Sequence, residues 1–139
     1  MPQSSARSWL AVDVGNSRVK AGLFVSDPDA TEHVLPLCKA SFSTVLGDGL
    51  PWDELSTVHE GQEFQGVVVG SNQHGVDRVT AEWSQRSDLD LLVVRDSRQF
   101  PIAVDVDFPD RVGFDRLLNA VAVNVIRAPG HAAIVVDCG

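Results

Sequence analysis

The sequence lacks several features that mark common classes of protein. It contains no tyrosine, only two cysteines, and no apolar run approaching the ~18 residues that a membrane-spanning helix needs. Cys38 and Cys138 lie far apart, and neither belongs to a C-x-x-C pair or to a Cys/His pattern with the spacing of metal ligands. This argues against a zinc site or a disulfide framework. The first residues include no long apolar segment of the kind that directs secretion. We therefore expect a soluble cytoplasmic protein with no membrane partner.

Positive charge is also scarce. Eleven Lys and Arg against nineteen Asp and Glu give a formal net charge of −8, and the cations are scattered along the chain. A nucleic-acid-binding surface needs clustered basic residues, so we expect no nucleic-acid partner. With 139 residues, of which 44% are apolar, the chain has enough material for one compact domain.

Hydrophobic patterns predict the α/β class. Residues 9–14 and 18–25 form a predicted hairpin, because two β-rich runs flank Gly-Asn-Ser and the second run alternates apolar and polar positions. A third strand is expected at residues 33–42, where Pro36 would restrict it to an edge or an early position. Short apolar runs predict further buried strands at residues 66–70, 89–94 and 132–136. Helices are expected from Pro51, over residues 76–83, and from Asp110 to the Pro129-Gly130 stop. This order predicts a mixed sheet with an antiparallel three-strand start and helices packed on it.

The segment DVGNSRVK follows the first apolar run and has the chemistry of a phosphate site. A turn containing Gly15 lets backbone N–H groups approach phosphate oxygens, and Asn16 and Ser17 add side-chain donors. Asp13 could hold Mg²⁺ directly or through water, while Lys20 could offset charge on a transferring phosphoryl group. The alternative is a plain hairpin turn with solvated cations. The spacing of a Walker-type P-loop is absent.

A second motif, PDRVGFDR, precedes the apolar pattern of the longest predicted helix. Asp115, near a helix amino terminus, would stay ionised and could accept the proton of a substrate hydroxyl that attacks phosphorus. Arg116 could bind a substrate carboxylate in a fork. In the alternative interpretation, Asp110 caps the helix and the Asp115-Arg116 pair consists of ordinary surface charges.

The last five residues, VVDCG, repeat the pattern of an apolar run that ends in Asp-x-Gly. If Asp13 and Asp137 both lay at strand ends brought together, they would form a pair of carboxylates around a metal-bound phosphate. By itself the pattern is also that of a simple turn.

The three motifs, in this order, resemble those of the type III pantothenate kinases, which are bacterial members of the actin/hexokinase/Hsp70-like ATPase superfamily. The first phosphate motif of that family, D-x-G-N-[ST]-x-x-K, is matched by Asp13, Gly15, Asn16, Ser17 and Lys20. The substrate motif, G-x-D-R, is matched by Gly113, Asp115 and Arg116. The second phosphate motif, D-x-G-T-A, is matched by Asp137 and Gly139 as far as the chain extends.

This resemblance implies a ribonuclease H-like domain, with residues 1–139 as the amino-terminal half of a two-domain kinase. The implied reaction is ATP-dependent phosphorylation of pantothenate to 4'-phosphopantothenate, the first step of coenzyme A biosynthesis. The family implies Asp115 as the base, Arg116 and Gly113 at pantothenate, Asp13 and Asp137 on the metal side, and Gly139 at phosphate. It also implies Mg²⁺, a monovalent cation (K⁺ or NH₄⁺) and a homodimer. We expect the 139 residues alone to be inactive.

Two departures from the family pattern concern the substrate loop. Many members carry Tyr and Asn just before the proline that corresponds to Pro109, whereas this chain has Val106, Asp107 and Phe108 there. Phe114 replaces a commonly smaller residue and would either narrow the pocket or pack beneath the helix. Two other functions therefore stay open: a nucleotide-binding regulator of the same fold without turnover, and another small-molecule kinase or phosphatase of the superfamily.

Overall fold

The computed structural model describes residues 7–27, 29, 34–59 and 64–137. Contacts within the chain divide it into two units. The first, here called the sheet unit, comprises Met1–Asp29 and Pro36–Arg95, and the second, here called the helix unit, comprises Ala30–Leu35 and Asp96–Gly139. That residues 1–139 are the amino-terminal domain of a two-domain kinase stays a prediction.

The sheet unit is built on five strands in the order β3-β2-β1-β4-β5. Their bounds are β1 Arg7–Val14, β2 Arg18–Ser26, β3 Leu37–Val45, β4 Phe64–Gly70 and β5 Leu91–Val94. The first three pair antiparallel, and β4 and β5 run parallel to β1. The expected α/β class, with a mixed sheet and an antiparallel three-strand start, is confirmed. Pro36 immediately precedes β3, which is an edge strand as predicted.

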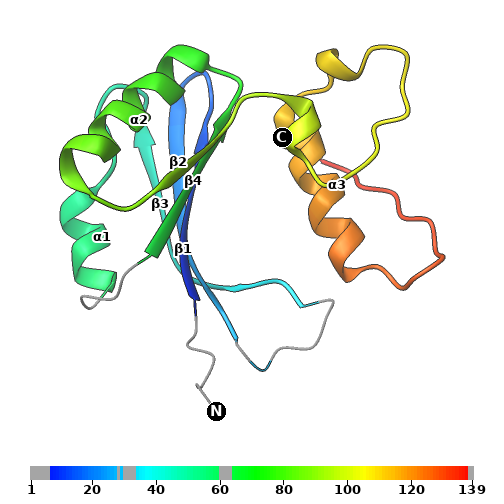
Figure 1. Ribbon diagram of the computed structural model, residues 1–139, viewed down its shortest axis with the longest axis horizontal. Helices are drawn as coiled ribbons and strands as arrows, with labels where there is room; N and C mark the ends of the chain where they lie inside the picture. Colours follow the sequence, from blue (N-terminus) through cyan, green and yellow to red (C-terminus); the bar gives the residue numbers. More distant parts are fainter. Residues whose placement is uncertain (1–6, 28, 30–33, 60–63, 138–139) are drawn as a thin grey trace. The chain divides into compact units, whose positions relative to one another are not determined.

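Two helices, α1 (Trp52–His59) and α2 (Gln73–Arg86), lie against one face of the sheet (Figure 1). The α2 helix begins after Asn72, whose side chain accepts a hydrogen bond from the Gly75 backbone N–H at 2.9 Å. Its apolar positions 76, 79 and 83 face the sheet, as the periodicity predicts. The core between helices and sheet consists of Leu10, Val12, Val14, Val19, Ala21, Leu50, Leu55, Val68, Val76, Val79 and Trp83.

Two predictions about strands are wrong. Residues 132–136 form none of the five strands and are exposed, with 92% of Ile134 accessible, because no strand of the described chain pairs with them. The run at 89–94 was expected to be covered on both faces, yet β5 is an edge strand in which Leu92 is 57% exposed. An apolar run identifies neither the neighbouring strand nor the covering layer, and both are needed for burial.

The helix unit contains two 3₁₀ turns, η1 (Ser97–Gln99) and η2 (Pro109–Arg111), and the helix α3 (Phe114–Ile126). The expected helix start at Asp110 is wrong, because Val112 and Gly113 adopt extended backbone conformations that separate η2 from α3. Asp110 therefore does not cap α3, and its carboxylate instead accepts a hydrogen bond from Ser97 Oγ at 3.3 Å. Gly113 is the amino-terminal cap.

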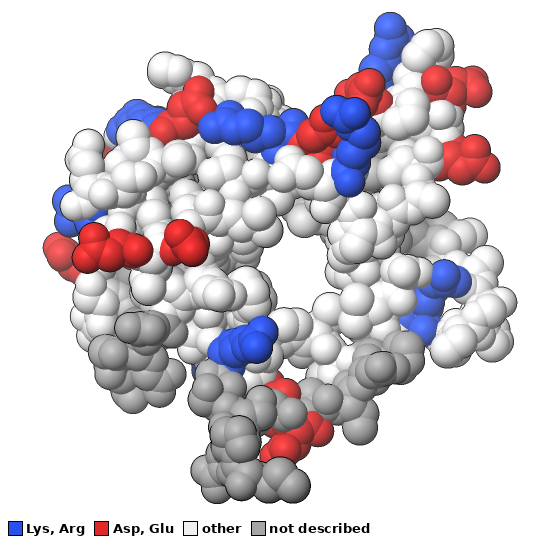
Figure 2. Space-filling view, viewed as in Figure 1, with Lys and Arg blue, Asp and Glu red and all other residues white. Residues whose placement is uncertain are grey.

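Charges of both signs are interspersed on the face of the molecule that Figure 2 shows, where lysine and arginine lie beside acidic side chains. Among the described residues, no helix has the length and apolar character needed to cross a membrane.

Candidate functional site

The first motif lies at the end of the sheet where β1 finishes and β2 begins, which is the carboxyl end of β1. Residues 15–17 form the connecting loop, and the Gly15 backbone N–H donates to the Arg18 carbonyl at 2.9 Å. The Leu46 N–H, after β3, donates to the Ser17 carbonyl at 2.9 Å, so the loop is also tied to the third strand. A Cβ on Gly15 would lie 3.3 Å from the Arg18 carbonyl oxygen, a tight contact that favours glycine here. Asn16 and Ser17 are exposed.

Asp13 and Lys20 lie directly opposite each other in the β1–β2 register. Val12 and Val14 point into the core, so Asp13 lies on the other face of the sheet, and Lys20 shares that face. Directly opposed residues have Cβ atoms roughly 4.5 to 5.5 Å apart, which places a carboxylate beside an ammonium group. Both residues are exposed. The structure thus brings together Asp13 and Lys20, two of the three charged residues of the first motif.

The sequence analysis missed two features at the same end of the sheet, Gly70 and the amino terminus of α2. Gly70, at the end of β4, pairs with Val14, and a Cβ on Gly70 would collide with the Val14 carbonyl oxygen. The Asn72 N–H donates to the same carbonyl at 3.5 Å, so the amino terminus of α2 lies at the end of β1. A helix amino terminus carries partial positive charge, which favours anions nearby. A glycine after the apolar run, followed by Ser-Asn before a helical pattern, was the signal available in the sequence.

The second motif lies in the helix unit at the start of α3. The backbone N–H groups of Arg116 and Leu117 donate to the Gly113 carbonyl at 3.1 and 3.2 Å, closing the first turn. A Cβ on residue 113 would collide with Asp115 Oδ1 and would lie 3.6 Å from Arg116 Nη1. Both charged side chains therefore turn back over Gly113. Asp115 and Arg116 are exposed, so they are accessible to a small molecule.

The third motif differs from its prediction. Asp137 follows an exposed segment that is not part of the sheet, so it does not lie at the end of a strand as predicted. Its Oδ2 lies 3.5 Å from Asn119 Nδ2 of α3. Gly139 lies outside the described residues. Grouping of Asp13 with Asp115 and Asp137 stays a prediction, since the first lies in the sheet unit and the others in the helix unit.

The described residues include no group of three or more His, Cys, Asp or Glu side chains arranged to hold a metal ion. Mg²⁺ in phosphoryl-transfer sites usually has one or two carboxylates, with phosphate oxygens and water as its other ligands. The carboxylate of Asp13, which is exposed at the end of β1 beside the loop of residues 15–17, is of the type that this requirement names.

The loop before α3 contains the residues that differ from the family pattern described above, and the structure shows their contacts. Val106 and Phe108 are 51% and 61% exposed, and the Arg111 guanidinium lies over the Phe108 ring at 4.6 Å. Phe114 is half-buried, and its ring centroid lies 5.6 Å from that of Phe100. Phe114 thus has a packing role within the helix unit.

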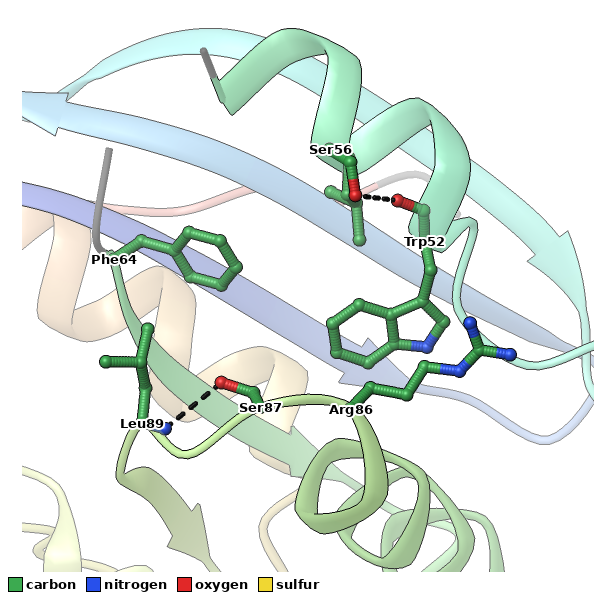
Figure 3. Close-up of a pocket in the computed structure, with 7 residues that line it drawn as sticks. Trp52, Ser56, Phe64, Arg86, Ser87 and Leu89 are labelled. Atoms are coloured by element: carbon green, nitrogen blue, oxygen red, sulfur yellow. Dashed lines mark hydrogen bonds between the residues drawn. The ribbon is translucent and has the colours of Figure 1, made fainter. Parts of the chain in front are cut away.

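A cavity in the sheet unit is lined by residues outside the first motif (Figure 3). It is found where β4 begins and α2 ends. This is the end of the strands opposite to the end that carries Asp13. Its lining residues are Trp52, Leu55, Ser56, Phe64, Arg86, Ser87 and Leu89. None of them belongs to the three motifs, so the candidate site is defined by the first motif and not by this cavity.

Comparisons with known proteins agree with the motifs. The family model described as type III pantothenate kinase matches residues 9–139. A type III pantothenate kinase of Thermomicrobium roseum is 27% identical over 139 residues, covering 94% of this chain and 50% of the relative. One of Streptomyces avermitilis is 28% identical over 137 residues, covering 94% and 51%. The chain spans about half the length of these curated relatives.

Among solved structures, the Aquifex aeolicus member of the Ppx/GppA family aligns with a TM-score of 0.39 and 10% identity. The alignment covers 69% of this chain and 37% of that chain. This likeness is too weak to add to the fold assignment, which follows from the strand order.

Proposed function

The chain belongs to the type III pantothenate kinase family, and from this premise we propose that the whole protein transfers the γ-phosphoryl group of ATP to pantothenate. The product would be 4'-phosphopantothenate, in the first step of coenzyme A biosynthesis. In this proposal, the 139 residues are the amino-terminal half of the enzyme and are inactive by themselves. The relatives in which the activity is named are about twice as long, which supports this view.

The observation that carries the proposal is the arrangement of the first motif. Asp13 and Lys20 are opposed on one exposed sheet face, beside a loop in which Gly15 permits close backbone approach. A triphosphate needs backbone donors, a cation and a carboxylate that can hold its metal ion. Asn16 and Ser17 supply further donors in the same loop. The motif therefore supplies a cation, a carboxylate and side-chain donors for a phosphate tail.

We assign the acceptor chemistry to the second motif. Asp115 accepts the proton of the primary hydroxyl of pantothenate, and Arg116 binds its carboxylate, with Gly113 making room for both side chains. In a loose transition state that proton leaves late, so the placement of Asp115 matters more than its basicity. Asp13 and Asp137 would hold Mg²⁺, which neutralises phosphate charge when bound, and Gly139 would lie at phosphate. A monovalent cation (K⁺ or NH₄⁺), a homodimeric assembly and a cytoplasmic location complete the proposal.

The test is a coupled kinase assay on the whole protein, with pantothenate and a panel of sugars as acceptors. We expect turnover with pantothenate and none with the sugars. Asp115→Asn should lower the rate with pantothenate at least ~100-fold, because a positioned base contributes about that much to catalysis. Asp88→Asn, an exposed carboxylate after α2, serves as the matched control and should retain full activity. Turnover of a sugar but not of pantothenate would assign the protein to another kinase of the superfamily.

The second candidate function is a nucleotide-binding regulator without turnover. The exposed Phe108–Arg111 pair favours it, since many catalytic relatives are expected to carry polar residues at this loop. This candidate predicts that the whole protein binds ATP, phosphorylates no acceptor, and keeps its function when Asp115 becomes Asn. A separate assay of residues 1–139 tests the fragment, for which phosphopantothenate formation at ordinary rates would contradict the proposed need for the second half.

A further inference from the structure

Arg18 lies within the first motif at a position that the family pattern leaves variable. It is the first residue of β2, it is exposed, and it lies two residues before Lys20. Residues two apart on a strand share a face, so Arg18 lies on the same face as Lys20 and Asp13. Its backbone carbonyl accepts the hydrogen bond from Gly15 that closes the loop. Arg18 is therefore part of the loop structure as well as of the charged face.

Ser43 on the edge strand β3 holds the side chain of Arg18. Arg18 Nε donates to Ser43 Oγ at 2.7 Å, and Nη2 donates to the Ser43 carbonyl at 3.1 Å. In the register, Ser43 lies opposite Lys20, which in turn lies opposite Asp13. The two hydrogen bonds thus draw the guanidinium diagonally toward the row formed by Asp13, Lys20 and Ser43.

A guanidinium fixed in this way is suited to an anion. It carries five N–H donors, and the bonds to Ser43 use two of its three nitrogens. No carboxylate in the described part of the chain forms an ion pair with Arg18. Because Ser43 is neutral, the full positive charge remains on an exposed face next to Lys20. Arginine whose orientation is already fixed loses less entropy when it binds phosphate.

We propose that Arg18 is a further phosphate-binding residue, which contacts the polyphosphate tail of the nucleotide and is positioned for this role by Ser43. This inference rests on the proposed use of ATP, and it adds a second cation to the one expected from the family motif. The competing explanation is that Arg18 only ties β2 to the edge strand β3. The two explanations differ in ligand dependence: a phosphate contact affects ATP but not adenosine, whereas a structural tie affects folding and both ligands alike.

The experiment is isothermal titration of the whole protein with ATP and with adenosine, alongside thermal unfolding. We expect Arg18→Ala to raise the Kd for ATP about ten-fold, the size typical of one charge-assisted contact, while the Kd for adenosine is unchanged. Ser43→Ala should raise the Kd for ATP by a smaller factor, roughly three-fold, because the guanidinium remains but is no longer held. Arg7→Ala, an exposed arginine at the opposite end of β1, is the matched control and should bind both ligands normally.

Equal affinity of Arg18→Ala and wild type for ATP would overturn the inference, as would a parallel loss of ATP and adenosine binding. If Arg18→Ala does not fold, Arg18→Lys keeps the charge without the fork and should bind ATP with intermediate affinity. Wild-type protein that binds ATP but does not phosphorylate pantothenate would reject the proposed reaction and leave Arg18 testable by titration. Wild-type protein that does not bind ATP would reject both.

Discussion

The two units of the chain place their motifs on very different supports. The sheet unit holds its motif at the ends of paired strands, above a core that includes Leu10, Val12 and Trp83, each at most 1% exposed. In the described part of the helix unit, the buried side chains are Ser97, Phe100 and Leu117. The first motif is thus supported by a paired sheet with a buried core, whereas the second motif depends on a few local contacts at the start of α3.

This difference shows how each motif can fail. Asp13 and Lys20 keep their relation as long as the β1–β2 ladder is intact, because the register sets it. The side chains of Asp115 and Arg116 keep their positions over residue 113 because that residue is a glycine without a side chain. A core substitution should therefore disable the first motif by unfolding, while a single methyl group should disable the second without unfolding.

The largest effect is expected for Trp83→Ala in the sheet unit. Trp83 is 1% exposed, and its ring contacts Trp52 and Phe64 at centroid distances of 5.7 and 5.6 Å. Its Nε1–H also donates to the Leu89 carbonyl at 2.7 Å, so truncation leaves a cavity and removes a donor. We expect the free energy of unfolding to fall by about 3 to 5 kcal/mol. Urea denaturation would measure it, and a loss below about 1 kcal/mol would contradict the description of the core.

A smaller effect is expected for Leu117→Ala in the helix unit. Leu117 is 3% exposed, but it has few buried neighbours in its own unit, so the site can relax. We expect a loss of about 2 kcal/mol, at the low end for such truncations. Hydrogen exchange should show faster exchange in α3 while β1 and β4 stay protected. Leu118→Ala is the matched control, since Leu118 is 37% exposed and should show a smaller change. Equal deprotection of β1 would show that the two units unfold together.

The third prediction concerns Gly113→Ala, which adds one methyl group beneath Asp115. The new Cβ would displace the carboxylate, and that group can rotate away because it ends a flexible side chain. We expect kcat/KM for pantothenate to fall roughly ten-fold, while stability falls by less than about 1 kcal/mol. In an Asp115→Asn background the same substitution should cost little further activity. Fully additive losses would show that Gly113 does not act through Asp115.

The smallest effect is expected at the boundary of the helix unit, where Asp96 caps η1. Hydrogen bonds from the side chain and backbone of Arg98 lower the pKa of Asp96 from 3.8 to about 2. Because the native pKa lies below the unfolded value, the stabilisation is present above about pH 4 and is lost as the pH falls through about 2. The Tm of wild type should therefore be slightly higher than that of Asp96→Asn at pH 6, and the two Tm values should converge near pH 2. A difference that persists at pH 2 would contradict the assignment.

Local patterns in the sequence predicted most of the sheet unit. The alternation through Val19, Ala21 and Leu23 identified β2, and the spacing of Val76, Val79 and Trp83 identified α2. These patterns are reliable because they involve residues that are near in the chain. Burial was predicted wrongly where it depends on distant residues, as for Leu92 at a sheet edge and for Ile134, which has no neighbouring strand in the described structure.

Residue identity and short spacing were enough to predict the α/β class, the order of the three motifs and the family to which they point. Three further features became visible only in the folded chain: Asp13 lies opposite Lys20, Ser43 holds Arg18, and Gly70 packs against the end of β1. Strand register and inter-strand contacts arise from residues far apart in the chain, and no periodicity within one segment encodes them.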